Sequence, residues 1–186
     1  CRWKKLSTKV TVKEAAAIPS PANPAVPDSS KDTANSKKII GYFAAWSRYL
    51  GFTPEKLDAN KLTHINYAFA NIGSDLTVEL GYPDIDEENI RQLKQLKKIN
   101  PQLKTIIAVG GWSWSGRFSD VALTQSSREK FADSLVDFII RYNFDGVDID
   151  WEYPVSGGEP TNTKRPEDKY NFTLLMKTLR ERLDER

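Results

Sequence analysis

The chain has 186 residues, of which 39% are hydrophobic and 11% aromatic, so it is long enough for one ordinary domain with a sizeable core. Its 27 basic and 25 acidic residues are spread along the chain, and the net charge of +2 gives no case for binding nucleic acid or a membrane surface. One cysteine excludes an internal disulfide, and one histidine leaves a Ser-His-Asp triad a single candidate base. No apolar run reaches the ~18 residues of a membrane span.

The first 36 residues differ in kind from the rest. Four prolines between residues 19 and 27 alternate with Ala, Asn, Ser and Asp, which is typical of an extended linker. Before them, the alternating run "TKVTV" is typical of a strand and is consistent with the end of a preceding module. The chain starts with Cys1 and shows no secretory signal segment, so we interpret it as a fragment or a processed piece, with a lipid-modified Cys1 as the alternative.

From residue 37 onward, apolar strand-like runs alternate with helical patterns. Strands are predicted at 39–45, 64–70, 105–109 and 146–151, and helices at 87–99, 128–142 and 167–183. A shorter segment, 53–61, predicts one helical stretch. This alternation predicts four parallel βα units in a sheet covered on both faces. Four units fit either a small doubly wound sheet or half of a (β/α)₈ barrel, and both folds bind ligands at the carboxyl ends of the strands.

The fourth strand-like run, "FDGVDIDWEYP", carries four carboxylates within eight residues. In a strand, Asp148, Asp150 and Glu152 share one face, whereas Trp151 and the other apolar residues face the covering helices. Neighbours on one face lie about 6.6 Å apart. Two charges at that separation repel by about 2.5 kcal/mol at an effective dielectric of about 20. We therefore expect at least one of the three pKa values to be raised.

A carboxylic acid that stays protonated at the mouth of a strand suits general acid catalysis. Glu152 is the outermost acid with the longest reach, so it is the predicted acid, and Asp145, at the start of the strand with opposite parity, is assigned a structural role. The alternatives are a buried polar cluster without chemistry and a divalent metal site. A metal would need further oxygen ligands on the other strand ends, where we find none, so we predict neither a metal nor a cofactor.

The spacing Asp145-x-x-Asp148-x-Asp150-x-Glu152, followed by Tyr-Pro, resembles the DxxDxDxE signature of glycoside hydrolase family 18, the chitinases. The similarity extends from about residue 37 to the C-terminus, because "IIGYFAAW", "THINYAFA" and "TIIAVGGWSWSGRFSD" resemble the first three barrel strands. It implies an α/β (β/α)₈ TIM barrel, of which residues 37–186 hold the N-terminal half, about four βα units. It also implies a secreted enzyme whose partner is chitin or chitooligosaccharides, with a further carbohydrate-binding module upstream in the parent protein.

The resemblance also implies a role for each acid. Glu152 would protonate the glycosidic oxygen, and Asp150 would hold the 2-acetamido group of the substrate, whose carbonyl oxygen attacks the anomeric carbon. Asp148 would exchange hydrogen bonds with Asp150. This substrate-assisted retaining mechanism is a known exception to the rule that carboxylate separation predicts the stereochemical outcome.

Aromatic rings stack on the apolar faces of sugars, and the resemblance places several of them in the substrate site. The residues expected to line it are Tyr42, Phe69, Gly111, Trp112 and Tyr153. Trp46 and Tyr49, just past the first strand, are candidates for outer glycone subsites.

The sequence departs from the family pattern in two respects. Ala108 stands where the family often has a serine bonded to the inner aspartate. The family's later strands also supply a Met-x-Tyr-Asp segment and a tryptophan that forms the floor of the site. Neither is present in this sequence, so we expect little or no activity from these 186 residues alone. Two alternative functions stay open: a non-catalytic chitin-binding protein, and a relative that acts on peptidoglycan or N-glycan cores.

Overall fold

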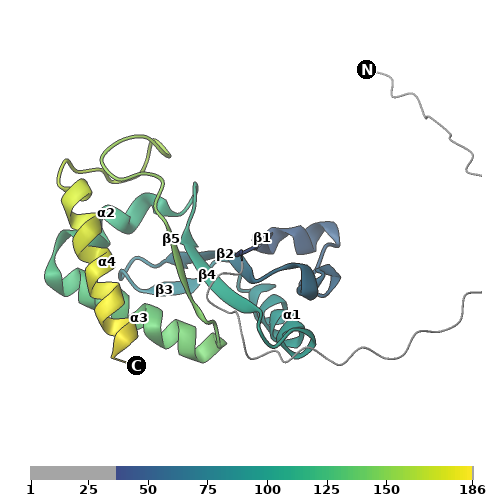
Figure 1. Cartoon of the computed structure of the whole chain (residues 1–186). Helices are drawn as coiled ribbons and strands as arrows, with labels where there is room; N and C mark the ends of the chain where they lie inside the picture. The colour runs from purple at the N-terminus through teal and green to yellow at the C-terminus, as the bar shows by residue number, and fades with distance from the viewer. Residues whose placement is uncertain (1–36, 186) are drawn as a thin grey trace, which may run out of the picture. The chain divides into compact units, whose positions relative to one another are not determined.

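A computed structural model describes residues 37–185, and the linker and strand predicted within residues 1–36 lie outside the described residues. Four parallel strands form a sheet in the order β1-β2-β4-β5 (Figure 1). Their bounds are Ile40–Ala44 for β1, His64–Ile72 for β2, Lys104–Gly110 for β4 and Gly146–Asp150 for β5. The four predicted parallel strands are therefore confirmed. A fifth strand, β3 (Val78–Leu80), was not predicted and pairs antiparallel with β2.

Helices follow the strands β2, β4 and β5 in the chain. Their bounds are Asp86–Ile99 for α1, Phe118–Leu123 for α2, Gln125–Tyr142 for α3 and Asp168–Asp184 for α4. Figure 1 shows α2, α3 and α4 together beside β5, with α1 near β1 and β2. The start of α3 lies three residues before the predicted one, because Thr124 and Ser127 form a capping box that supplies hydrogen bonds to the free backbone groups.

One predicted helix is wrong. The segment 53–61 forms two separate 3₁₀ turns, Pro54–Lys56 and Ala59–Lys61, because Leu57 between them is extended and Asp58 caps the second turn. The 3₁₀ helix Ala45–Leu50, which follows β1, was not predicted from the sequence. That helix carries aromatic residues that were expected near the substrate site.

The hydrophobic core lies between the sheet and its helices. Alternate residues of β2 and β4, such as Ile65, Tyr67 and Ile107, point to this side and are each 1% exposed. Helix α3 contributes fully buried side chains, including Phe131 and Leu135. The other face of each strand forms the inner side of the sheet, where Tyr42, Asp148 and Asp150 lie.

The inner face is more open than predicted. Ile40 and Tyr42 of β1 point to it and are 57% and 58% exposed, and every residue of β5 is half-buried. The expectation that both faces of the sheet are covered is therefore wrong for β1 and β5 within the described residues. No helix between residues 37 and 185 is long and apolar enough to cross a membrane.

Candidate active site

The predicted row of acids lies at the carboxyl end of β5. Asp148 and Asp150 point to the inner face, while Trp151 is 6% exposed and stacks on Phe118, with ring centroids 5.5 Å apart. The strand ends at Asp150, so Glu152 follows it outside the ladder. There its backbone N–H donates to Ser115 Oγ at 2.8 Å. The predicted parity is thus confirmed for Asp148, Asp150 and Trp151, whereas Glu152 lies beyond the end of the strand.

Two side chains from neighbouring strands hold Asp148. The hydroxyl of Tyr42 on β1 and Asn66 Nδ2 on β2 both donate to Asp148 Oδ2, the latter at 3.0 Å. Ala108, the residue paired with Asp148 on β4, is fully buried and has no side-chain donor. The missing serine hydroxyl therefore leaves an aspartate that still accepts two hydrogen bonds. Asn66 was not predicted from the sequence.

The closeness of the acids changes their ionisation. Burial raises the pKa of Asp150, and the charges of Glu152 and Asp148 raise it further. Burial and the hydrogen bond to Asp148 likewise raise the pKa of the Tyr42 hydroxyl, and Glu152 raises that of Tyr153. The expectation of at least one raised carboxyl pKa is met at Asp150. The larger cause is its burial, and repulsion by the neighbouring acids is the smaller one.

Asp145 lies apart from the row, at the other end of β5. Its Oδ2 accepts hydrogen bonds from Lys97 Nζ at 2.7 Å and from the Thr105 N–H at 2.8 Å, and Lys104 Nζ lies 3.5 Å from its Oδ1. Burial opposes ionisation of this carboxyl, but these donors outweigh it and hold its pKa below the usual value. Asp145 thereby ties α1, β4 and β5 together.

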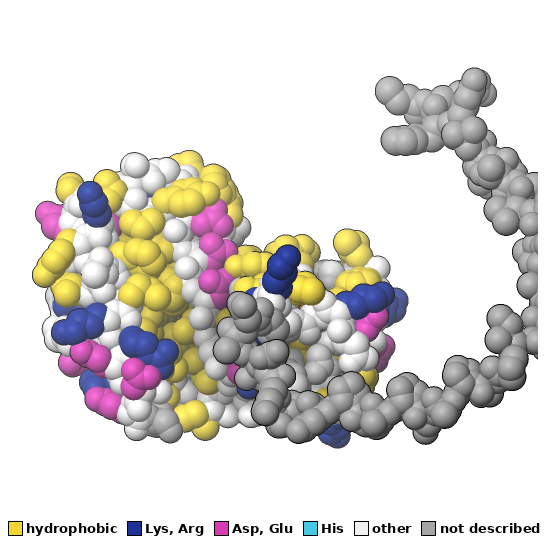
Figure 2. Space-filling model, in the orientation of Figure 1, with side chains coloured by type: hydrophobic (Ala, Val, Ile, Leu, Met, Phe, Trp, Pro, Cys, Tyr) yellow, Lys and Arg dark blue, Asp and Glu magenta, His cyan; other side chains and the backbone are white. Residues whose placement is uncertain are grey.

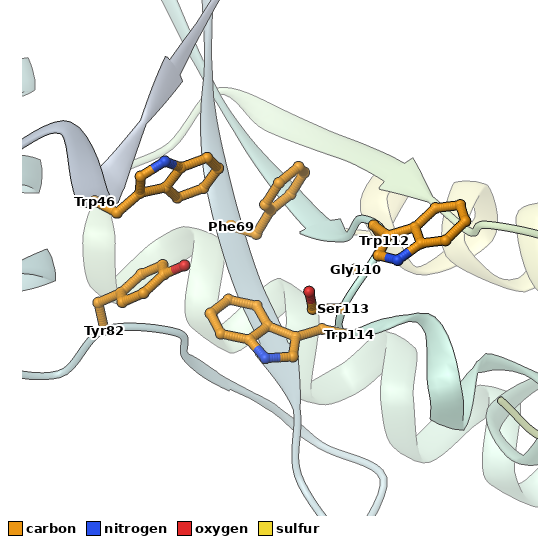
Figure 3. A pocket seen from close by; sticks show the side chains of 7 residues that line it. All are labelled: Trp46, Phe69, Tyr82, Gly110, Trp112, Ser113 and Trp114. Atoms are coloured by element: carbon orange, nitrogen blue, oxygen red, sulfur yellow. The ribbon is translucent and has the colours of Figure 1, made fainter. Parts of the chain in front are cut away.

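A cavity of about 530 Å³ opens beside the acids, at the carboxyl ends of β2 and β4 (Figure 3). We call it the aromatic cavity, and its lining residues are Trp46, Phe69, Tyr82, Gly110, Trp112, Ser113 and Trp114. Gly110 pairs with Asp150 in the sheet, so the cavity adjoins the row of acids. Of the predicted binding residues, Trp46, Phe69 and Trp112 line it. Tyr82 and Trp114 were missed, although "GWSWSG" places Trp114 two residues after Trp112.

Ring contacts and the close approach of the Gly111 backbone to Phe69 shape the aromatic cavity. Trp46 stacks on Phe69 with centroids 6.1 Å apart, and Tyr82 packs on Trp114 at 5.1 Å. Gly111 has φ +72°, and a Cβ on it would lie 2.7 Å from the Phe69 ring. A side chain at Gly111 would thus both strain the backbone and displace the ring.

The remaining predicted aromatic residues lie outside the lining of this cavity. Tyr49 is 57% exposed, and its hydroxyl donates to Asp84 Oδ2 at 2.8 Å. Tyr153, directly after Glu152, is 48% exposed. Tyr42 borders the acids through Asp148. The structure therefore divides the predicted binding residues between the aromatic cavity and the surroundings of the acidic row.

The sequence model of the glycosyl hydrolases family 18 matches residues 38–186. The chain belongs to this family. It is 45% identical to Chitinase A1 of Niallia circulans, over 86% of this chain and 29% of that protein. It is 34% identical to Endochitinase 1 of Metarhizium anisopliae, over 86% of this chain and 41% of that protein.

Solved structures of chitinases match the fold. Chitinase ChiA74 from Bacillus thuringiensis has a TM-score of 0.74 at 36% identity, over 81% of this chain and 33% of that one. The catalytic domain of psychrophilic chitinase B from Arthrobacter TAD20 has a TM-score of 0.74 at 32% identity, over 80% of this chain and 48% of that one. The predicted fold class, part of a family 18 (β/α)₈ TIM barrel, is confirmed. The chain spans less than half the length of each of these four relatives.

One further contact in this candidate site was not predicted from the sequence. Trp112 is 51% exposed, and its Nε1 donates to Glu159 Oε1 at 2.6 Å. Glu159 lies in the segment between β5 and α4, which starts next to the acids. Among residues 37–185, no three His, Cys, Asp or Glu side chains are grouped so that they could hold a metal ion.

Proposed function

We propose that the protein containing this chain hydrolyses β-1,4-linked N-acetylglucosamine polymers, namely chitin and chitooligosaccharides, with retention of configuration. The observation that carries the proposal is the row Asp148, Asp150 and Glu152 at the carboxyl end of β5, beside an open aromatic cavity. Chitinases are also the family 18 relatives that the chain resembles over most of its length. Parallel α/β barrels place their chemistry at this end of the strands.

In the proposed reaction, Glu152 donates its proton to the glycosidic oxygen as the bond to the anomeric carbon breaks. The carbonyl oxygen of the substrate's own 2-acetamido group attacks that carbon from the other face and forms an oxazolinium ion. Asp150 accepts a hydrogen bond from the acetamido N–H, which aligns the attacking oxygen, and its negative charge stabilises the ion. A water molecule then opens the ring, and ionised Glu152 accepts the water proton.

Asp148 supports this cycle from behind Asp150. Its Oδ2 accepts from Tyr42 and Asn66, which stabilise negative charge on Asp148 while Asp150 turns to the substrate. Burial and the nearby charges of Glu152 and Asp148 raise the pKa of Asp150, so its negative charge is better stabilised once the substrate's N–H donates to it. Asp145 takes no part in the chemistry and holds the opposite end of the strand.

The aromatic residues are proposed to bind the sugar chain. Phe69 and Trp112 offer ring faces inside the aromatic cavity, and Tyr42 and Tyr153 flank the acids. Gly111 leaves room for the backbone to approach Phe69. Trp46 and Tyr49, which lie on the 3₁₀ helix after β1, extend this surface and are proposed as outer glycone subsites.

We also propose that residues 37–186 are the N-terminal half of the catalytic domain, that residues 1–36 are a linker, and that the protein acts outside the cell. The family match to residues 38–186 and the chain's share of its relatives support the boundary. One similar protein, chitinase ChiW from Paenibacillus, is described as expressed on the bacterial cell surface.

The mechanism is tested on the full-length protein by following chitohexaose hydrolysis with proton NMR. Retention predicts that the new reducing ends form first as the β-anomer. Since the acetamido group is the nucleophile, a fully deacetylated hexamer of the same length is expected to remain intact. Initial α-anomer, or cleavage of the deacetylated hexamer, would refute substrate assistance. Binding of chitohexaose without any product would instead indicate the non-catalytic chitin-binding alternative.

A further inference from the structure

The substrate site carries negative charge that no described cation neutralises. Among residues 37–185, no Lys or Arg forms an ion pair with Asp148, Asp150, Glu152 or Glu159, whereas Asp145 at the other end of β5 has two lysine partners. Figure 2 shows acidic side chains in a row beside a broad hydrophobic patch, with no basic side chain in the row. Such a surface attracts a positively charged ligand.

Glu159 adds its charge at the edge of an exposed aromatic ring. Its Oε1 accepts the hydrogen bond from Trp112 Nε1 at 2.6 Å, and its other carboxylate oxygen has no hydrogen-bond partner among the described residues. The ring of Trp112 is half exposed and lines the aromatic cavity. An open indole face attracts a cation, and a carboxylate at the ring edge supplies the opposite charge. The pair therefore has the two elements of an ammonium-binding site.

The position of Glu159 is fixed by the segment that also holds Glu152. Asn162 Nδ2 donates to the Glu152 carbonyl at 3.0 Å, and the Asn162 N–H donates to the Glu159 carbonyl at 3.1 Å. Gly158 has φ +67°, and a Cβ on it would lie 2.0 Å from the Glu152 carbonyl oxygen, so the chain folds tightly back on itself. Glu159 is thus held at a defined place relative to the acid and to Trp112.

We propose that Glu159 and Trp112 form a subsite that favours a glucosamine unit, which carries a free amine, over an N-acetylglucosamine unit. The favoured substrate class is then partly deacetylated chitin. This inference rests on the proposed function: the reacting sugar keeps its acetamido group, and a neighbouring sugar, stacked on Trp112, carries the ammonium. Glu159 acts as a specificity-determining residue through its charge and as a positioning residue through its hydrogen bond to the indole.

Two variants of the full-length protein separate these roles. Glu159→Gln keeps an oxygen that can accept from Trp112 but removes the charge, whereas Glu159→Ala removes both. Glu87→Gln is the matched control, because Glu87 is an exposed acid on α1, outside the site. The measured quantity is the kcat/KM for a partly deacetylated hexamer divided by that for a fully acetylated hexamer. The assays are run at mildly acidic pH, where the amine is protonated and a glutamate is ionised.

Because the ion pair between Glu159 and the sugar ammonium would be exposed to solvent, we expect Glu159→Gln to lower this ratio by about two- to fivefold. Added salt should remove the difference between this variant and the wild type. Glu159→Ala is expected to lower the ratio equally and also to raise KM for the fully acetylated hexamer, because Trp112 is no longer held. Glu87→Gln is expected to leave both substrates unaffected. An unchanged ratio in Glu159→Gln would overturn the proposal, as would equal losses on both substrates.

The proposed function and this inference fail differently. Absence of wild-type hydrolysis of the acetylated hexamer would refute the function alone. The same ratio can then be measured as calorimetric dissociation constants, which test the preference for the amine without catalysis. If the wild type hydrolyses the acetylated hexamer but the charge of Glu159 has no effect on the ratio, only the inference is wrong.

Discussion

Asp145 is predicted to stabilise the catalytic domain by fixing the start of β5. Replacing it with Asn removes the negative charge and one of the two acceptor oxygens that face Lys97, Lys104 and Thr105. A hydrogen bond to a charged group contributes about 1.5–3 kcal/mol. The Asp145 side chain is only 20% exposed, so solvent replaces these contacts poorly. We expect Asp145→Asn to lower the free energy of unfolding by about 2 kcal/mol at neutral pH.

The pH dependence gives the sign of this effect. The pKa of Asp145 is lower in the folded protein than its usual value of about 3.9, so its stabilisation is fully present above that pH. The stabilisation is lost as the pH falls through the lower, folded-state pKa. The gap between the wild type and Asp145→Asn should therefore be largest near neutral pH and should close in strong acid.

The assay is urea unfolding of the full-length protein at neutral and at acidic pH, followed by tryptophan fluorescence. Asp184→Asn is the matched control. It breaks the ion pair between Asp184 and Arg180, and the Asp184 side chain is 66% exposed. Such surface pairs contribute about 1 kcal/mol or less. A gap below about 0.5 kcal/mol at neutral pH, which is typical of surface substitutions, would refute the reasoning. A gap that widens in acid would refute it as well.

Two further predictions concern the site. Gly111→Ala places a methyl group on a residue with φ +72° and within 2.7 Å of the Phe69 ring. Strain and overpacking together are expected to lower the free energy of unfolding, measured in urea, by about 2–4 kcal/mol. A change of less than about 0.5 kcal/mol would contradict the close approach. Tyr42→Phe removes one donor to Asp148, and we expect steady-state kinetics to show kcat for chitohexaose about tenfold lower, equivalent to a hydrogen bond of about 1.4 kcal/mol. A full kcat with a raised KM would show that Tyr42 binds sugar without supporting Asp148.

Much of the fold could be predicted because its regular elements are long. Apolar runs and helical periodicity placed all four parallel strands and the three long helices within three residues of their observed ends. The missed elements are short: β3 has three residues, and α2 and the 3₁₀ helix Ala45–Leu50 have six each. So few residues complete at most two helical turns, or fewer than two full strand alternations, and the pattern then carries little information.

The acids of the site were predictable for the same local reason, since strand parity alone sets Asp148 and Asp150 on one face. The groups that hold them were not. Asn66 lies 82 residues from Asp148 in the sequence, Ser115 lies 37 from Glu152, and Glu159 lies 47 from Trp112. Polar residues such as Asn66 have no periodic signal, so only the folded chain brings them to their partners.

The central claim is that Glu152 is the proton donor of a chitin-cleaving site. It is tested most directly by Glu152→Gln in the full-length protein, with chitohexaose hydrolysis and calorimetric binding measured on the same preparation. Removing a general acid predicts a loss of kcat of about 10²-fold or more, while chitohexaose still binds and Glu87→Gln retains wild-type turnover. Undiminished hydrolysis by Glu152→Gln would contradict the account.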